Sequence, residues 1–219
     1  MAQRLNIKYV HAFADLFCVY IVNIAINSQG IFMEGVAPNI GTSLTGRILV
    51  SPPGIEDSRF RSALTLVIEH SEQGAIGLIL NRPSLVPLSE LIPDWEEIGA
   101  IPEVVFAGGP VDHDALIALG KSKNPDGELV LGAHSVDLDD QPALVEAEGI
   151  DSIRVFAGYA GWEPGQLEKE IIEDYWWLVD GEIEDIFSNE PAKLWSKVLS
   201  RQQSRIRWYA HYPVDIKSN

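Results

Sequence analysis

The sequence contains the phrase Val-Phe-Ala-Gly twice, at residues 105–108 and again at residues 155–158. In both places a strand-like apolar run leads into the phrase, and a helix-like pattern follows a turn containing glycine and proline. A glycine there can adopt backbone angles that are closed to other residues, so the chain can turn sharply. We therefore predict two equivalent strand–turn–helix corners in one core, at Gly108 and Gly158. Neighbouring N–H groups at a helix N-terminus also attract anions, but we favour the architectural interpretation.

Strand-like and helix-like patterns alternate along the chain from residue 46 onward. Residues 71–74 separate two apolar runs by the length of a hairpin turn, which excludes an all-parallel sheet. Strands are predicted over residues 46–51, 63–70, 74–83, 104–107, 127–132, 153–158 and 175–179, and helices over 87–95, 112–120, 141–149, 164–173 and 190–202. We expect Asp112 or Asp114 to cap the second of these helices and Asn189 to cap the last. This interleaving predicts a mixed α/β or α+β class.

The first 40 residues differ from the rest of the chain. An apolar run from Tyr9 to Ile26 contains one acidic residue, Asp15, and its length and polar insertions argue against a membrane span. Three interpretations remain open: a signal peptide, an apolar helix that docks on the domain or anchors the chain, and a start codon placed too far upstream, with Met33 as the true start instead of Met1. We favour the last. We accordingly predict a variable segment over residues 1–40 and one domain over residues 41–219.

The composition limits the classes of function. The net charge of −16 disfavours broad nucleic-acid binding, because a negative surface repels phosphate backbones and anionic lipids. A single cysteine, Cys18, excludes an internal disulfide and a cysteine-based zinc site. We therefore expect a cytoplasmic protein, with no stable membrane insertion unless the run from Tyr9 to Ile26 is a true anchor.

Several segments together resemble the YqgE/AlgH family of uncharacterised bacterial proteins. They are "GRILVSPPGIEDSRF", "GAIGLILNRP", "VFAGGPV" and "VFAGYAGWEPGQLEKEI" followed by "WWLV", in order from about residue 46 to about residue 199. The most specific phrase is Gly-Trp-x-x-Gly-Gln-Leu-Glu at residues 161–168. The resemblance implies a single compact domain with a bent, partly barrel-like mixed sheet flanked by helices. It implies no established enzymatic activity, although one branch of the family was named as a regulator of alginate synthesis genes.

No catalytic, metal or cofactor signature is assembled in the sequence. "GKS" at residues 120–122 lacks the glycine that a phosphate-binding loop needs five positions earlier, and no G-x-G-x-x-G, G-x-S-x-G or H-x-x-x-H run occurs. A hydrolytic set could be drawn from Ser51, Asp57, Glu69 and His70, but sequence cannot supply the hydrogen-bonded geometry that acyl transfer needs. We expect no cofactor and no metal.

Four residues near the repeated phrase are candidates for a ligand site. Arg82 follows Asn81 at the end of an apolar strand and could hold a carboxylate or phosphate, although an internal ion pair is the simpler interpretation. Tyr159 and Trp162 lie in a glycine-rich turn, where aromatic rings bind ligands or partners, or fold back onto the core.

The last predicted helix carries a basic row. Lys193, Lys197 and Arg201 recur every four residues, and Arg205 continues the row. Such rows are usually solvated faces, but this one could also contact an acidic partner. The alternating rings of residues 175–177 place at least one aromatic side chain outward.

Two hypotheses follow. The first is a binding protein without catalytic activity that acts on an unknown protein partner or small ligand in the regulation of gene expression. The second is an enzyme whose site lies near the Gly108 and Gly158 corners, Asn81 and Arg82. A filled core between the two corners favours the first, and an open pocket favours the second.

Overall fold

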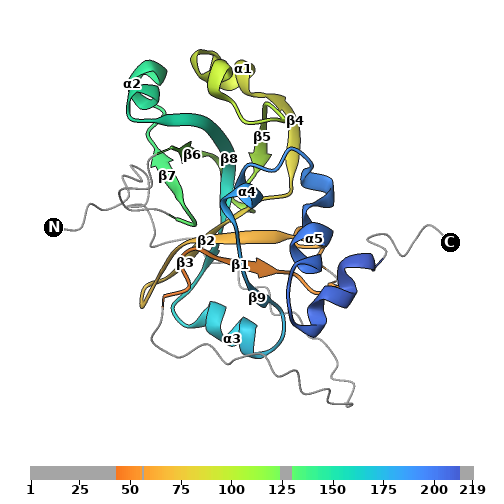
Figure 1. Ribbon diagram of the computed structural model, residues 1–219. Helices are drawn as coiled ribbons and strands as arrows, with labels where there is room; N and C mark the ends of the chain where they lie inside the picture. Colours follow the sequence, from red (N-terminus) through yellow and green to blue (C-terminus); the bar gives the residue numbers. More distant parts are fainter. Residues whose placement is uncertain (1–42, 56, 124–129, 213–219) are drawn as a thin grey trace. The chain divides into compact units, whose positions relative to one another are not determined.

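The computed structural model describes residues 43–55, 57–123 and 130–212 (Figure 1). The predicted segment over residues 1–40 lies outside the described residues, as do both candidate start positions and the first half of the strand predicted over residues 127–132. The division into a segment and a domain therefore stays a prediction. Among the described residues, no helix has the length and apolar character that crossing a membrane requires.

Nine strands and seven helical segments make up the described chain. In chain order they are β1 (Arg47–Val50), β2 (Leu64–Ser71), β3 (Gly74–Ile79), β4 (Pro83–Pro87), α1 (Leu88–Leu91), the 3-10 helix η1 (Pro93–Ile98), β5 (Val104–Ala107), β6 (Val111–Ser122), β7 (Ala133–Val136), α2 (Pro142–Ala147), β8 (Ile150–Trp162), α3 (Gln166–Ile172), β9 (Trp177–Asp180), α4 (Ile183–Ile186), α5 (Pro191–Ser200) and the 3-10 helix η2 (Arg205–His211).

The strands form one mixed sheet, which confirms the predicted fold class. Their order is β4-β5-β8-β3-β2-β1-β9, with β6 paired to β8 and β7 paired to β6. Among the described strands only β5 and β8 run parallel, and the predicted hairpin joins β2 to β3. The path of paired strands ends at β4 and β9, so the sheet is not closed into a barrel.

The longest strand, β8, belongs to both halves of this sheet. Its first part pairs with β5 and β6, and its last residues, 160–162, pair with β3 (Figure 1). Between these parts Gly158 has φ of +71°, a conformation that other residues adopt only with strain. The glycine therefore lets one continuous strand pass from one half of the sheet into the other.

The repeated phrase is a pair of neighbouring strands and not a pair of corners. Phe106 lies opposite Phe156, and Ala107 lies opposite Ala157, in the parallel β5–β8 ladder. The prediction of a helix after the first phrase is wrong, because strand β6 follows it. The helix predicted after the second phrase is present as α3, but β8 first continues through that phrase to Trp162. The repeated phrase instead places an alanine and a glycine of each copy, Ala107–Gly108 and Ala157–Gly158, where the two backbones approach each other closely.

The helix predicted over residues 112–120 is strand β6. Its "ALIAL" sequence favours a helix locally, but the segment pairs with β8 at positions from Val111 to Ser122 and with β7 as well. Alanine and leucine have high helix propensity, but the differences are small, and tertiary pairing of this extent overrides them. Asp112 has a positive φ of 47° in this strand, and neither it nor Asp114 caps a helix. The cap predicted at Asn189 is also wrong, since α5 begins after Glu190 without a side-chain cap.

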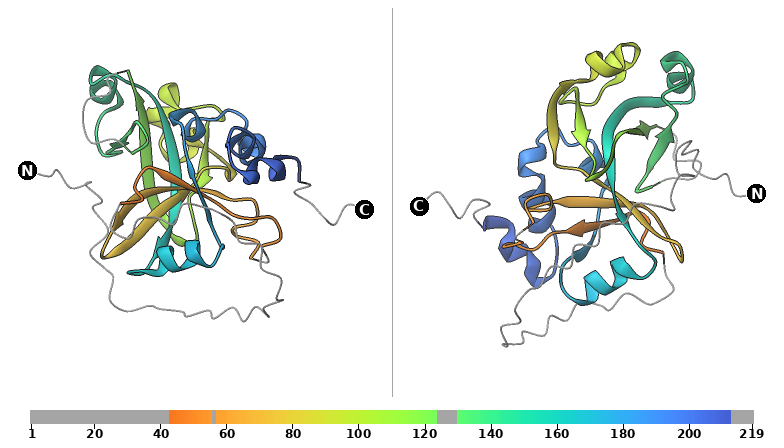
Figure 2. Two further views of the ribbon diagram at one scale, coloured as in Figure 1. Left: turned by 60° about the horizontal axis from the view of Figure 1, so that its bottom comes forward. Right: turned by 180° about the vertical axis from the view of Figure 1, so that it is seen from behind.

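Two apolar clusters cover the two halves of the sheet. One joins α1, η1 and α2 to β5–β8, with Leu88, Trp95 and Val145 buried against Val105 and Val155. The other lies under α3, which Figure 2 shows beside the strands of β1–β3. The helix α5 adds Leu194, Trp195, Val198 and Leu199 to the buried residues.

Substitution of Gly158 tests the contact between the two phrases. A Cβ atom at Gly158 would lie 2.8 Å from the carbonyl oxygens of Gly109 and Val111, in addition to the strain of its positive φ. We expect Gly158→Ala to lower the free energy of unfolding by about 3 kcal/mol or more, measured by urea denaturation.

The matched control is Gly54→Ala. Gly54 also has a positive φ, +87°, but nothing lies within 4 Å of an added Cβ. Only backbone strain remains, and the expected loss is about 1 kcal/mol. Equal losses for the two variants would contradict the close approach.

Candidate functional site

The space between Gly108 and Gly158 is filled. A Cβ atom at Gly108 would lie 2.2 Å from the Gly158 carbonyl oxygen, and one at Gly109 would lie 2.0 Å from the Tyr159 carbonyl carbon. The backbones themselves therefore occupy the region where the second hypothesis placed an active site. No ligand fits between the two glycines.

Asn81 and Arg82 both make structural contacts. The Asn81 side chain is buried; its Oδ1 accepts a hydrogen bond from the Leu64 N–H at 3.1 Å, and its Nδ2 donates to the Ser62 carbonyl at 2.7 Å. Arg82 donates to the carbonyl oxygens of Asn81 and Arg61. Burial lowers the pKa of the Arg82 guanidinium. Among the described residues, the hydrogen-bond acceptors of this arginine are carbonyl groups.

The residues of the hydrolytic set do not come together. The Ser51 hydroxyl is buried and accepts a hydrogen bond from the Ala63 N–H at 2.8 Å. His70 accepts the Leu44 N–H at Nδ1, so its Nε2 carries the proton and donates to Glu168 at 3.0 Å. Both nitrogens of the ring are used, and neither can take a proton from a serine.

Asp57 is bound elsewhere. Its carboxylate accepts hydrogen bonds from the Arg59 guanidinium at 2.7–3.1 Å, and these bonds lower the pKa of Asp57. The pair lies in the loop between β1 and β2, away from Ser51 and His70 in its hydrogen bonding.

The phrase that carries the family resemblance builds a structural network around Glu170. Its Oε2 accepts the indole N–H of Trp162 and that of Trp176, each at 2.8 Å, and its Oε1 accepts from Gln166. The two indole rings meet edge to face, with centroids 6.1 Å apart. Together with the Glu168–His70 bond, this network fixes α3 to the sheet. Trp162 is therefore a buried core residue and not a ligand platform.

Tyr159 lies on β8 beside the first phrase and is half-buried. Burial raises the pKa of its phenol, and the charge of Asp112 acts in the same direction. Its backbone is the surface against which Gly109 packs. Tyr159 therefore belongs to the packed contact between the two phrases, whereas the Trp162 indole is bonded to Glu170.

The predicted basic row is divided among three surroundings. Lys193 pairs with Glu190 on the same helix. Lys197 borders a pocket. Arg201 turns inward and bonds both oxygens of Asp185, a carboxylate that is fully buried, and lies 3.4 Å from Glu182. A charge reversal at Arg201 would leave Asp185 buried against a second acid, so it would test folding and not binding.

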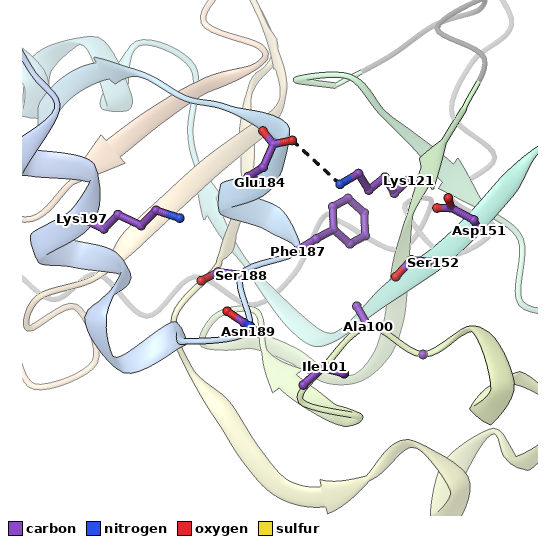
Figure 3. Close-up of a pocket in the computed structure, with 11 residues that line it drawn as sticks. Ala100, Ile101, Lys121, Asp151, Ser152, Glu184, Phe187, Ser188, Asn189 and Lys197 are labelled. Carbon is purple, nitrogen blue, oxygen red and sulfur yellow. Dashed lines mark ion pairs between the residues drawn. The ribbon is translucent and has the colours of Figure 1, made fainter.

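A pocket lies between α4–α5 and the ends of strands β6 and β8, and sequence reasoning missed it. Its volume is about 620 Å³. Figure 3 shows side chains of distant segments directed toward one another across it. The lining residues are Gly99, Ala100, Ile101, Lys121, Asp151, Ser152, Glu184, Phe187, Ser188, Asn189 and Lys197.

A buried arginine ties two walls of this pocket together. Arg154 is 1% exposed and donates to the carbonyl oxygens of Ala100, Ile101 and Pro102 on one side and of Ser188 on the other, at 2.8–3.3 Å. Its guanidinium lies 4.3 Å from the centre of the Phe106 ring. Burial lowers the pKa of Arg154 to about 10, which leaves it cationic at neutral pH. The signal in the sequence was one charged residue inside an otherwise apolar strand.

The chain also exposes aromatic rings at η2. Trp208 is 69% exposed, and Tyr209 lies between Trp177 and Tyr212, with ring centroids 5.0 and 6.3 Å away. Arg205 and Arg207 are exposed on the same segment. We call this the C-terminal surface: Arg205, Arg207, Trp208, Tyr209 and Tyr212. Tyr175 is exposed as well, whereas Trp176 is buried, so the prediction of at least one outward ring at residues 175–177 is confirmed.

The described part of the chain brings no three histidine, cysteine, aspartate or glutamate side chains together in a group that could hold a metal ion. "DHD" at residues 112–114 lies in strand β6, where the pairing with β8 is irregular, and all three side chains are exposed. The structure thus offers two surfaces for binding, the pocket and the C-terminal surface.

The sequence matches a family model described as AlgH-like over residues 48–207. A UPF0301 protein of Streptomyces avermitilis is 42% identical over 189 residues, covering 81% of this chain and 96% of that protein. A UPF0301 protein of Mycobacterium leprae is 34% identical over 192 residues, covering 84% and 95% of the two chains.

Two solved structures share the fold. The crystal structure of protein DIP2367 from Corynebacterium diphtheriae superposes with a TM-score of 0.72 at 27% identity, over 77% of this chain and 92% of that one. The solution structure of the AlgH protein from Pseudomonas aeruginosa gives 0.59 at 29% identity, over 83% and 98%. The described fold is therefore one already seen by crystallography and in solution.

Removal of the Glu170 carboxylate tests the network of the family phrase. We expect Glu170→Ala to lower the free energy of unfolding by about 3 kcal/mol, because two indole N–H groups lose a charged acceptor. Urea denaturation followed by tryptophan fluorescence measures the loss. The control Glu173→Ala removes an exposed acid of the adjoining turn, 3.9 Å from Lys169, and should change stability by less than about 0.5 kcal/mol. Equal losses of unfolding free energy in Glu170→Ala and Glu173→Ala would show that the Glu170 network does not stabilise the fold.

Arg154 can be tested in the same way. Arg154→Met keeps an apolar chain of similar length but leaves two buried and two part-buried carbonyl groups without their donor, and we expect a loss of about 3 kcal/mol. Arg154→Lys should recover part of this loss, since one ammonium group cannot reach all four acceptors. The exposed Arg59→Met is the control, with an expected change below about 1 kcal/mol. A fully stable Arg154→Met protein would refute the clamp.

Proposed function

The chain belongs to the AlgH-like family, and from that premise we propose that it is a cytoplasmic binding protein without catalytic activity, which regulates gene expression by binding an acidic protein partner at its C-terminal surface. The regulatory part of this proposal is supported by the family resemblance, because one branch of that family is named as a regulator of alginate synthesis genes.

The observation that carries the proposal is the charge of the segment over residues 191–212. It contains five of the 16 lysine and arginine residues of the chain and none of its 32 acidic residues. Within it, Arg205 and Arg207 flank Ile206 and stand directly before the exposed Trp208. A hollow of about 310 Å³ lies beside this ring, lined by Ser200, Arg207, Trp208 and His211. Arginine, tryptophan and tyrosine are the residues enriched at the centres of protein interfaces.

The charge of the whole chain favours a protein partner over a nucleic acid. A polynucleotide presents a long row of phosphates, and the net charge of −16 would repel all of it beyond the basic segment. An acidic protein segment can bind the arginines with a few carboxylates, while the rest of the partner avoids the negatively charged surface of this chain. This difference supports a local, protein-sized contact.

The close packing of the glycines supports binding over catalysis. The region proposed for an enzyme site, near Gly108, Gly158, Asn81 and Arg82, is filled by backbone and by hydrogen bonds that hold strands together. The His70 ring is likewise occupied at both nitrogens.

The test is the double substitution Arg205→Glu with Arg207→Glu. In a strain that lacks the gene, the wild-type chain should restore the transcript profile that the deletion alters, and the double variant should not. Affinity capture with each protein should show at least about tenfold less of one partner for the variant, since each lost charge pair removes about 1 kcal/mol or more.

The control is Lys123→Glu with Lys169→Glu, the same change of charge at two side chains that are 76% and 73% exposed elsewhere on the molecule. It should behave as the wild type does. Capture of the same partners by both double variants would refute the C-terminal surface, and a deletion without any change in transcripts would refute the regulatory role.

A further inference from the structure

We propose that the pocket between α4–α5 and the ends of strands β6 and β8 binds a small anionic metabolite through a carboxylate or phosphate group. This site is separate from the C-terminal surface, and it does not depend on the function proposed above.

The two acids of the pocket are already matched by lysines. Glu184 lies 3.9 Å from the Lys121 ammonium group, and Asp151 lies 3.6 Å from that of Lys123. Lys197 faces the same space from α5 (Figure 3), and no carboxylate of the described residues lies within ion-pair distance of it. The pocket therefore has a surplus cation in a protein that is otherwise strongly acidic.

The buried Arg154 adds a second surplus charge at the pocket wall. Among the described residues, Arg154 donates its hydrogen bonds to neutral carbonyl groups, and none of these residues places a carboxylate on it. A charge in such a buried position is screened less by water than one on the surface. The combined field of Lys197 and Arg154 favours an anion over a neutral or cationic ligand.

The same arginine gives the pocket a fixed shape. Its bonds to Ala100 and Ile101 hold one wall and its bond to Ser188 holds the opposite wall. A site whose walls are set before binding spends less of its interaction energy on ordering itself. The volume of about 620 Å³ falls within the range of about 300–1,000 Å³ that is usual for small-ligand sites.

Polar groups that can donate to an anion line the space between the lysines. The Ser188 hydroxyl oxygen accepts the Glu190 N–H at 3.3 Å, and its own proton is therefore directed elsewhere. Asn189 and Ser152 add an amide and a second hydroxyl. Hydroxyl, amide and ammonium donors around one space form the donor set that carboxylate and phosphate oxygens require.

The experiment is a titration of the full chain with two probes, inorganic phosphate and succinate, followed by amide NMR shifts at constant ionic strength set with sodium chloride. We expect saturable shifts at Gly99–Ile101, Ser152 and Ser188 with at least one probe. Saturation by phosphate alone identifies a phosphorylated metabolite as the ligand class, and saturation by succinate alone identifies a carboxylate.

Variants separate the pocket from general charge effects. Lys197→Met should weaken binding of the effective probe at least about tenfold, which is the loss of one charge-assisted contact. Lys193→Met is the matched control, one turn earlier on the same helix and paired with Glu190, and it should bind as the wild type does. The Arg205→Glu, Arg207→Glu protein should also keep the pocket shifts, because its altered residues lie outside the lining.

Three results would overturn the proposal. They are the absence of saturable shifts with both probes, shifts that sodium chloride reproduces by itself, and equal weakening by Lys193→Met and Lys197→Met. Unfolding curves of each variant establish that it is folded, and Lys121→Met provides a second test from the opposite wall if Lys197→Met proves unstable.

Discussion

The close approach of two backbones at the repeated Phe-Ala-Gly phrase determines the arrangement of the sheet. Because Gly108 and Gly109 lack Cβ atoms, the chain after β5 can lie directly on the Gly158–Ala160 backbone of β8. The Gly108 N–H then donates to the Ala157 carbonyl, and the Gly108 carbonyl accepts the Ile79 N–H, each at 2.8 Å. One short stretch thus links β5, β8 and β3, and the long β8 strand can serve both halves of the sheet.

The first phrase also supports the pocket. Phe106 packs edge to face on Phe156, with centroids 6.0 Å apart, and its ring lies against the Arg154 guanidinium. An aromatic face stabilises a nearby cation, and more so when both are removed from water. The guanidinium in turn holds the carbonyl groups of the two pocket walls. The first copy of the repeated phrase thus helps to hold Arg154 in place, and Arg154 in turn fixes the walls of the pocket proposed to bind an anion.

The features that the sequence predicts well are those set by neighbouring residues. The β2–β3 hairpin follows from a four-residue turn, and α2 and α3 follow from proline and glycine at their ends. Strand β6 could not be predicted, because its alanines and leucines fit a helix as well as a strand, and its partner β8 lies some 35 positions further along the chain. The pocket could not be predicted for the same reason, since its residues come from segments between Gly99 and Lys197 that only the fold brings together.

The basic row shows a further limit of sequence-based prediction. Spacing places Lys193, Lys197 and Arg201 on one face of the helix, but only the buried Asp185 explains why Arg201 turns inward.

The Arg201–Asp185 pair gives the pocket and the C-terminal surface a common support. Asp185 also accepts the Glu182 N–H at 2.9 Å, so the start of α4, with Glu184 on the pocket, is held to the end of α5, from which the chain enters η2. A buried ion pair that is broken at one partner leaves an uncompensated charge, which makes this connection costly to open. The Arg201–Asp185 pair therefore holds both the α4 side of the pocket and the end of α5, from which the chain continues to the C-terminal surface. This one ion pair therefore holds in place both the helix that carries Lys197 on the pocket and the start of the segment that carries Arg205 and Arg207.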